Sequence, residues 1–254
     1  MGKNKLKKFR EMEEMDIVLQ YPFSVLQAGE FPLRGKWNDS FFHNTRPIVV
    51  ELGCGKGEYT VELARRNPEV NYIGIDIKGA RMWSGARQAV AEKLQNVAFV
   101  RTSIELIDRI FAPGELSELW ITFPDPQMKK ERKRLTGTRF MELYRKILTP
   151  GGTVNLKTDS PFLYTYTTAM LAANGIVPVT ADSDIYRNGP REGEILGIRT
   201  YYEQQWLQRG LTIKYVSFRL WPEPSPLTEP DVEIEHDTYR SFSRGTLEKE
   251  GLRT

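Results

Sequence analysis

The chain contains 254 residues, with 36 lysines and arginines against 33 aspartates and glutamates, which gives a formal net charge of +3. Hydrophobic residues make up 40% of the sequence and charged residues 27%. This composition excludes a wholly disordered or collagen-like chain and leaves enough apolar material for one large domain. Cys54 is the only cysteine, and His43 and His236 are the only histidines. Neither a disulfide within the chain nor a metal site of the zinc type is therefore expected.

The first ten residues hold five bases and no acid. They are not followed by the apolar segment of an export signal, and the sequence contains no run of about 20 apolar residues that could cross a membrane. We therefore expect a cytoplasmic protein without a membrane partner. Residues 1–46 form a predicted basic N-terminal extension.

Strands that alternate with helices are expected after this extension. The predicted strands are 48–52, 72–76, 97–101, 119–123 and 153–157, and the predicted helices are 59–66, 80–94, 140–147 and 162–173. This alternation favours an α/β fold with a mostly parallel sheet that is covered on both faces.

The last predicted elements are a helix over 201–209 and a strand over 212–219. The strand alternates apolar and polar side chains, so we expect it to be a half-exposed edge strand at which the sheet ends. Residues 222–254 hold eight acids and four bases, and four prolines lie between 222 and 230. We therefore separate a central domain, 47–221, from an acidic C-terminal tail, which could mimic RNA or, as we favour, aid solubility.

A glycine-rich turn joins the first strand to the first helix. It reads Glu51-Leu-Gly53-Cys-Gly55-Lys-Gly57, and Asp76 ends the second strand 23 residues after Gly53. Glycines let a ligand approach the backbone where a helix begins, and an acid about 20 positions later can accept hydrogen bonds from ribose hydroxyls. The arrangement predicts a nucleotide-type cofactor site.

The glycine spacing distinguishes two cofactor classes. Dinucleotide-binding loops read Gly-x-Gly-x-x-Gly, whereas here a glycine recurs at every second position after Glu51. This pattern resembles the first motif of class I methyltransferases that use S-adenosylmethionine, and a carboxylate beside the loop would repel a pyrophosphate. Because Cys54 lies inside the loop, we do not expect the cysteine nucleophile that carbon-5 pyrimidine methylation needs.

A second candidate site follows the strand over 119–123. It reads Phe123-Pro-Asp125-Pro-Gln127-Met128, and the next six residues, 129–134, hold five bases and one acid. Prolines restrict the backbone on both sides of Asp125 at the carboxyl end of a strand, where open α/β sheets bind ligands. The basic run predicts binding of a polyanion such as RNA.

These segments together resemble the tRNA (guanine-N7)-methyltransferase family, whose members carry a Phe-Pro-Asp-Pro or similar segment before a basic stretch. The resemblance covers about residues 47–220. It implies a Rossmann-like class I methyltransferase fold with an antiparallel edge strand. It also implies methyl transfer from S-adenosylmethionine to N7 of a guanine in the variable loop of tRNA, which gives 7-methylguanosine.

The resemblance and the charge pattern together assign the candidate site residues. Asp125 corresponds to the catalytic-site aspartate of the family. Cofactor contacts are expected from Glu51, Gly53, Gly55, Asp76, Thr102 and Asp125. By resemblance, substrate contacts are expected from Lys129, Asp159, Thr200 and Glu203. By charge, phosphate contacts are expected from Lys129, Arg132, Lys133 and Arg134.

The chain departs from the family pattern after Asp125. Relatives often have a tryptophan followed by histidine or proline there, where this chain has Gln127 and Met128. Stacking of a base on such a tryptophan is therefore not expected. We can identify no family counterpart for the tail after residue 221.

The chemistry of guanine N7 needs positioning more than proton transfer, because this atom carries no proton at neutral pH and is exposed in the major groove. We expect Asp125 to accept guanine N1–H or N2–H and to stabilise the developing cation, with Asp159 and Glu203 as second candidates. Two alternatives stay open: a methyltransferase for another substrate, and a non-catalytic RNA-binding protein on the same scaffold. Both a monomer and a homodimer are compatible with the sequence.

Overall fold

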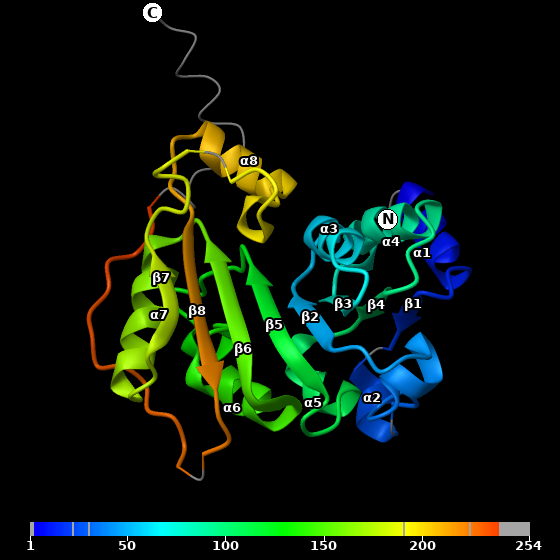
Figure 1. Cartoon of the computed structure of the whole chain (residues 1–254), viewed down its shortest axis with the longest axis horizontal. Helices are drawn as coiled ribbons and strands as arrows, with labels where there is room; N and C mark the ends of the chain where they lie inside the picture. The colour runs from blue at the N-terminus through cyan, green and yellow to red at the C-terminus, as the bar shows by residue number, and fades with distance from the viewer. Residues whose placement is uncertain (1–2, 22, 30, 190, 224, 239–254) are drawn as a thin grey trace, which may run out of the picture.

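The computed structural model describes residues 3–21, 23–29, 31–189, 191–223 and 225–238. In this part of the chain eight strands form one sheet in the order β1-β4-β3-β2-β5-β6-β8-β7 (Figure 1). Strands β1 to β6 run parallel to one another, and β8 runs antiparallel to both β6 and β7. The strands are β1 (Val18–Gln20), β2 (Ile48–Leu52), β3 (Asn71–Asp76), β4 (Val97–Arg101), β5 (Leu116–Thr122), β6 (Leu148–Thr158), β7 (Pro178–Asp182) and β8 (Lys214–Leu220).

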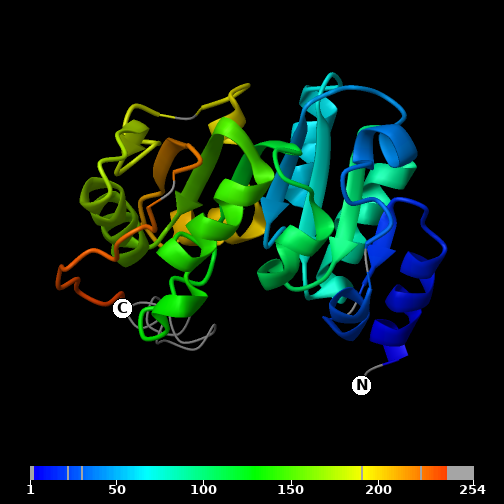
Figure 2. The ribbon, with the colours of Figure 1, turned by 90° about the horizontal axis from the view of Figure 1, so that it is seen from below.

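Helices cover both faces of this sheet (Figure 2). Neighbouring residues of one strand enter different cores: Val50 packs in the cluster that contains residues of α5, α6 and α7, whereas Val49 packs in the cluster that contains residues of α1, α3 and α4. The expected α/β fold with a mostly parallel sheet is confirmed. The helices are α1 (Lys3–Glu13), α2 (Phe23–Ala28), α3 (Glu58–Arg66), α4 (Gly79–Ala91), α5 (Ile107–Ile110), α6 (Thr138–Ile147), α7 (Pro161–Ala173) and α8 (Tyr201–Gln208), with a π-helix at Trp37–Phe42 and short 3-10 turns at Ile104–Leu106, Glu131–Lys133 and Ile195–Gly197.

The sheet does not end where the sequence predicted. The expected edge strand corresponds to β8, which is antiparallel as expected, but six of its seven residues are buried because β7 covers its outer side. β7 begins with Pro178 and exposes its three central side chains. Proline is tolerated at the first residue of an edge strand, but so short and exposed a strand has no buried apolar face from which the sequence could have predicted it.

Both segments that flank the predicted central domain pack on it. β1 pairs with β4, and Trp37 and Phe42 are buried in the same core as Val50. Residues 225–238, coloured orange to red in Figure 1, run beside α7, and Leu227 and Ile234 pack against that core. The described parts of 1–46 and 222–254 therefore share one core with 47–221. Residues 239–254 of the predicted tail lie outside the described residues.

None of the helices described is both long enough and apolar enough to cross a membrane.

Candidate functional site

A cavity of about 390 Å³ lies at the carboxyl ends of the central parallel strands. Strands β3 and β4 lie on one side of β2 and strand β5 lies on the other, so the cavity is at the point where the strand order reverses, the usual ligand position in open α/β sheets. The glycine loop, the ends of β3 and β4 and the segment after β5 form its walls. The lining residues are Leu52, Gly53, Asp76, Ile77, Lys78, Arg81, Thr102, Ser103, Ile104, Glu105, Phe123, Pro124, Asp125, Gln127, Lys133, Leu135 and Phe140.

The glycine loop, residues 53–57, has a backbone that other residues would adopt only at a cost. Gly53, Gly55 and Gly57 have φ angles of 78°, 55° and 75°, in the left-handed region that favours glycine. At Gly57 the restriction is also steric, because an added Cβ would lie 2.8 Å from the ring of Phe99. The glycines therefore let the chain turn sharply between β2 and α3 beside the cavity.

Asp76 closes this loop from the end of β3. One carboxylate oxygen accepts a hydrogen bond from the Gly55 amide (2.9 Å), and the other accepts one from the Lys78 amide (2.7 Å). Each oxygen keeps a further lone pair, and Asp76 lines the cavity. The side chain can therefore hold the loop and accept hydrogen bonds from a ligand at the same time.

Glu51 is buried and does not line the cavity. Its carboxylate accepts hydrogen bonds from the Thr60 amide (2.9 Å), the Thr60 hydroxyl and the Thr122 hydroxyl (2.5 Å). Burial raises the pKa of Glu51 from 4.5 to about 7, although these hydrogen bonds oppose the rise. Glu51 thus ties the end of β2 to both α3 and the end of β5, and its direct contact with a cofactor stays a prediction.

Thr102 follows β4 and also lines the cavity. The residue is 3% exposed, and its hydroxyl finds no hydrogen-bond partner among the described residues. A buried hydroxyl without a partner is costly, and it is one of the features by which a ligand site is recognised. The resemblance to the family placed an adenine-side contact at this residue, and the position of the hydroxyl is compatible with that role.

Asp125 lies in a loop, residues 123–130, whose backbone is unusual. Phe123 and Gln127 both have a φ of 49°, which is uncommon for residues other than glycine. The Phe123 amide donates to the carbonyl oxygen of Lys157 (2.8 Å), and an Asp125 carboxylate oxygen accepts from the Gln127 amide (3.0 Å). The turn holds the exposed Asp125 at the wall of the cavity.

The basic run after this loop divides into two kinds of side chain. Lys129 and Arg132 are exposed, and Lys133 is exposed but pairs with Glu105 (2.8 Å) at the rim of the cavity. Arg134 is 5% exposed instead, so it is the one member of the predicted phosphate-binding group that is enclosed in protein.

Arg134 joins the loop to helix α7. Its Nη2 donates to the carbonyl oxygen of Met128 (2.9 Å), and its guanidinium lies over the rings of Tyr166 and Phe162, 4.4 and 4.9 Å from their centroids. Such contacts are favourable electrostatically. A phosphate contact from Arg134 stays a prediction.

The remaining predicted substrate residues are Asp159, Thr200 and Glu203. All three are buried, and none lines the cavity. The Thr200 hydroxyl accepts from the Glu203 amide (3.2 Å) and caps the start of α8. In this structure Thr200 and Glu203 therefore lie at the start of a helix, and substrate contacts from the three residues stay predictions.

Glu203 also belongs to a buried network that the sequence did not reveal. Its carboxylate pairs with Lys157 Nζ (2.8 Å) and accepts from the Tyr186 hydroxyl (2.7 Å), and both members of the ion pair are fully buried. Burial lowers the pKa of Lys157 to about 8, against the opposing effect of Glu203. The available signal was a lysine inside the otherwise uncharged strand segment 153–158.

The structure thus brings Gly53, Asp76, Thr102, Asp125 and Lys133 to one cavity and leaves the other predicted residues outside its lining. The lining also includes Arg81 and Glu105, which the sequence analysis did not select. Over the part of the chain that is described, no group of three or more histidines, cysteines or acids could hold a metal ion.

Comparisons with known proteins give close relatives. Residues 45–216 match a family model described as a putative methyltransferase. The chain is 63% identical over 235 residues to the tRNA (guanine-N(7)-)-methyltransferase of Porphyromonas gingivalis, covering 92% of this chain and 96% of that protein. It is 54% identical over 254 residues to the protein of the same name from Bacteroides fragilis, covering 100% and 99%.

Solved structures with a similar fold are more distant in sequence. The 16S rRNA methyltransferase KamB superposes with a TM-score of 0.56 at 14% identity, covering 72% of this chain and 92% of that one. A 16S rRNA (adenine(1408)-N(1))-methyltransferase from Catenulisporales acidiphilia, determined with its cosubstrate SAM, gives a TM-score of 0.52 at 16% identity, covering 76% and 93%. These similarities establish a methyltransferase fold.

Proposed function

The chain belongs to the tRNA (guanine-N7)-methyltransferase family, and we propose that it transfers a methyl group from S-adenosylmethionine to N7 of a guanine in the variable loop of tRNA. The observation that carries this proposal is the cavity, in which the unpartnered hydroxyl of Thr102 and the exposed carboxylate of Asp125 line different walls. The first wall, formed by the glycine loop, Asp76 and Thr102, suits a nucleoside cofactor. The second wall, formed by the loop of Asp125, suits a base.

The residues of the first wall fit S-adenosylmethionine. The positive-φ glycines leave the backbone of the loop open to a ligand. Asp76 has lone pairs for ribose hydroxyls, and the Thr102 hydroxyl is a buried group that lacks a partner. When bound, S-adenosylmethionine supplies an electrophilic methyl group on a sulfonium.

The residues of the second wall can orient the base. Guanine N7 already offers a free lone pair, so the protein needs no general base and must hold the base in line with the methyl group. We assign to Asp125 the acceptance of guanine N1–H or N2–H, because its carboxylate is exposed at the cavity wall and its backbone turn is held by Gln127. There it stabilises the positive charge that develops as the base is methylated.

The exposed bases beside this wall suit the RNA backbone. Lys129 and Arg132 are exposed and form no ion pair with any other described residue, and Lys133 extends the charge to the rim of the cavity. Phosphate contacts of this kind position an RNA without reading its sequence. A cytoplasmic location and the choice between monomer and homodimer stay predictions from the sequence.

The test is methyl transfer from labelled S-adenosylmethionine to unmodified tRNA, with the modified base mapped by borohydride and aniline cleavage at 7-methylguanosine. Cleavage in the variable loop is the expected result. Label without that cleavage would contradict the N7 assignment and favour a methyltransferase for another position or substrate. No label despite measured cofactor and tRNA binding would favour the non-catalytic RNA-binding alternative.

A further inference from the structure

The C-terminal segment 225–238 is tied to helix α7 at both ends of that helix. At the carboxyl end of α7, Asn174 exchanges two hydrogen bonds with the backbone of Thr228 (2.8 and 2.7 Å). Farther along the segment, Glu229 accepts from the hydroxyls of Tyr166 (2.5 Å) and Thr138. Over these residues the tail predicted from the sequence is therefore packed across the fold. We call residues 225–238 the strap.

The strap reaches the amino end of α7 at Asp237. This residue is 7% exposed, and its carboxylate accepts from the Phe162 amide (3.0 Å) and the Ser160 hydroxyl. Ser160 is the N-cap of α7 and directly follows Asp159 at the end of β6. A carboxylate at the first turn of a helix is favourably placed for the free amides and the helix dipole.

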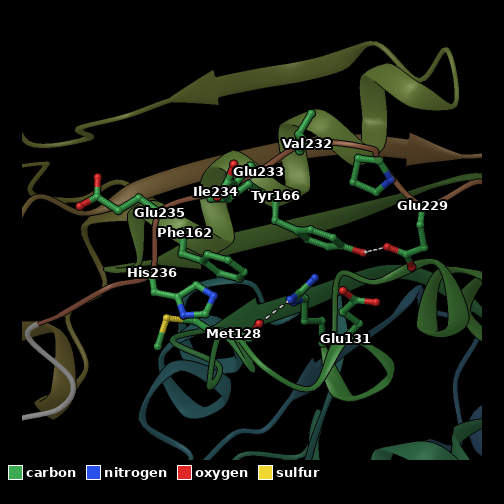
Figure 3. Close-up of a pocket in the computed structure, with 12 residues that line it drawn as sticks. Met128, Glu131, Phe162, Tyr166, Glu229, Val232, Glu233, Ile234, Glu235 and His236 are labelled. Atoms are coloured by element: carbon green, nitrogen blue, oxygen red, sulfur yellow. Dashed lines mark hydrogen bonds between the residues drawn. The ribbon is translucent and has the colours of Figure 1, made fainter.

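Asp237 also contacts the loop that carries Asp125. Its amide donates to the sulfur of Met128 (3.1 Å), and Met128 is the residue whose carbonyl oxygen accepts from Arg134. Figure 3 shows Met128 and His236 side by side next to Phe162, and the rings of His236 and Phe162 are 5.4 Å apart. Met128 is thus held by two hydrogen bonds, one from the strap to its sulfur and one from Arg134 to its carbonyl oxygen.

This arrangement offers the loop 123–130 a support that its own sequence lacks. Phe123 and Gln127 hold positive φ angles without being glycines, and such residues persist only where the surroundings hold them. Met128 directly follows Gln127 and precedes Lys129, so any displacement of Met128 is transmitted to the turn around Asp125.

We propose that Asp237 is a positioning residue for methyl transfer, which fixes the loop of Asp125 to the end of β6 and the start of α7. The proposal rests on the proposed function, since it makes the strap part of the guanine site. Asp237 acts through Met128 and Ser160 and touches no reacting atom. Its loss lowers the fraction of molecules in which Asp125 and Lys129 are correctly placed, and leaves the cofactor wall unchanged.

The same segment read as an RNA mimic would behave in the opposite way. A mimic must leave before tRNA binds, so loosening it would lower the KM for tRNA. In the structure the Asp237 carboxylate is satisfied by Ser160 and Phe162 within the protein, and apolar residues of the strap pack on the core. These contacts favour a permanent support.

The test compares Asp237→Ala, Asp237→Asn and Asn174→Ala in the full chain. Asn174→Ala is the matched control, because it frees the same strap at the end far from Met128. For Asp237→Ala we expect kcat/KM for tRNA to fall on the order of 10- to 100-fold, as small misplacements can cause, with unchanged affinity for S-adenosylmethionine. Asp237→Asn should recover part of the activity, because its amide oxygen can still accept from Phe162.

Hydrogen exchange of residues 123–134 gives a second readout that does not depend on activity. Asp237→Ala should speed exchange of these amides, while Asn174→Ala should not, and the midpoints of thermal unfolding of both variants should identify any global effect. If the wild-type protein does not methylate tRNA, the proposed function fails and the exchange data still test the support of the loop. Equal exchange and equal kinetics in the two alanine variants, or a lower KM for tRNA in Asp237→Ala, would overturn the proposal.

Discussion

The glycine loop 53–57 and the loop 123–130 both place positive-φ residues at the cavity, but they are stabilised in different ways. The first loop uses Gly53, Gly55 and Gly57, whereas the second uses Phe123 and Gln127. Glycine adopts these angles freely, while other residues in sparsely populated regions cost on the order of 1 to 3 kcal/mol each. The first conformation is therefore local, and the second depends on partners elsewhere in the fold.

The partners of the two loops confirm this difference. The glycine loop is closed by Asp76, which is 21 residues from Gly55 and ends the next strand. The second loop is held by Lys157 of the neighbouring strand, by Arg134 and by Asp237, which is 109 residues from Met128. The comparison teaches that the glycine loop is held within a single βαβ unit, β2-α3-β3, whereas the loop 123–130 depends on partners from distant parts of the chain.

The largest expected effect belongs to the second loop. Asp125→Asn should lower the rate of methyl transfer roughly 100- to 1,000-fold, the loss found when one charge-stabilising group is removed from an active site. Its affinity for S-adenosylmethionine should fall much less than the rate, because Asp76 and Thr102 are untouched. Single-turnover methylation and a cofactor titration measure the two quantities. An unchanged rate would remove Asp125 from the chemistry and with it the functional contrast between the loops.

A smaller effect is expected in the pH dependence of the folding stability, which tests how Glu51 holds the end of β2 before the glycine loop. Between about pH 4.5 and 7, folded Glu51 keeps a proton that the unfolded chain releases, so this group lowers the stability as the pH rises. Glu51→Gln removes that loss, so its stability relative to wild type should increase by about 2.5 kcal/mol from pH 5 to pH 8. Urea unfolding at both pH values measures the difference.

An exposed glutamate provides the control for this measurement. Glu14→Gln changes an exposed side chain that forms no ion pair with any other described residue, and its stability difference from wild type should be the same at pH 5 and pH 8. If Glu51→Gln also shows a constant difference, then Glu51 is ionised in the folded protein and does not form the protonated, buried tie between β2, α3 and β5.

Thr102→Val tests whether the Thr102 hydroxyl forms a hydrogen bond with the bound cofactor. Without ligand, removal of a buried hydroxyl that has no partner should stabilise the protein by about 1 kcal/mol, whereas loss of its hydrogen bond to the cofactor should weaken S-adenosylmethionine binding roughly 10-fold. Thermal unfolding and cofactor titration should therefore change in opposite senses. Thr165→Val on the exposed side of α7 is the control, and equal cofactor affinity in both variants would contradict the assignment.

The smallest expected effects come from the exposed bases of the second wall. Lys129→Gln and Arg132→Gln should each flatten the dependence of log affinity for tRNA on log salt concentration by roughly 0.7 to 0.9, the value of one phosphate contact. Lys130→Gln, at the neighbouring exposed position, should leave the slope unchanged. Filter binding over a range of salt concentrations distinguishes the variants, and an unchanged slope for Lys129→Gln would place its ammonium in solvent.

The position of the glycine loop and of Asp76 at the cavity could be predicted from the sequence, and their contact with a cofactor stays a prediction. The determinants of this position are short-range: a β-branched strand, glycines at alternate positions, and Asp76 at the end of the next strand. The substrate wall could be predicted only as a set of residue types. Asp125 and the basic run were recognised, but the burial of Arg134 between Met128 and two rings of α7 has no local signature.

The edge of the sheet and the packing of the C-terminal strap could not be predicted from the sequence, because neither has a local signature. β7 exposes its central side chains, so no hydrophobic period identifies it, and β8 appeared to be the edge although it is covered. The strap is acidic and rich in proline, as a solvated tail would be. Two of its five carboxylates nevertheless accept hydrogen bonds within the fold, Glu229 from Thr138 and Tyr166, and Asp237 from Ser160 and Phe162.

The sequence by itself determined the α/β class, the position of the cofactor loop and the family resemblance, because periodicity and glycine spacing act over a few residues. Only the tertiary structure decided which polar groups reach the cavity and which are buried in pairs such as Lys157 with Glu203. A side chain's exposure depends on segments that pack against it from distant parts of the chain. Asp237 and Met128 are in contact because the loop after β5 and the segment after β8 meet at the end of the sheet where α7 begins.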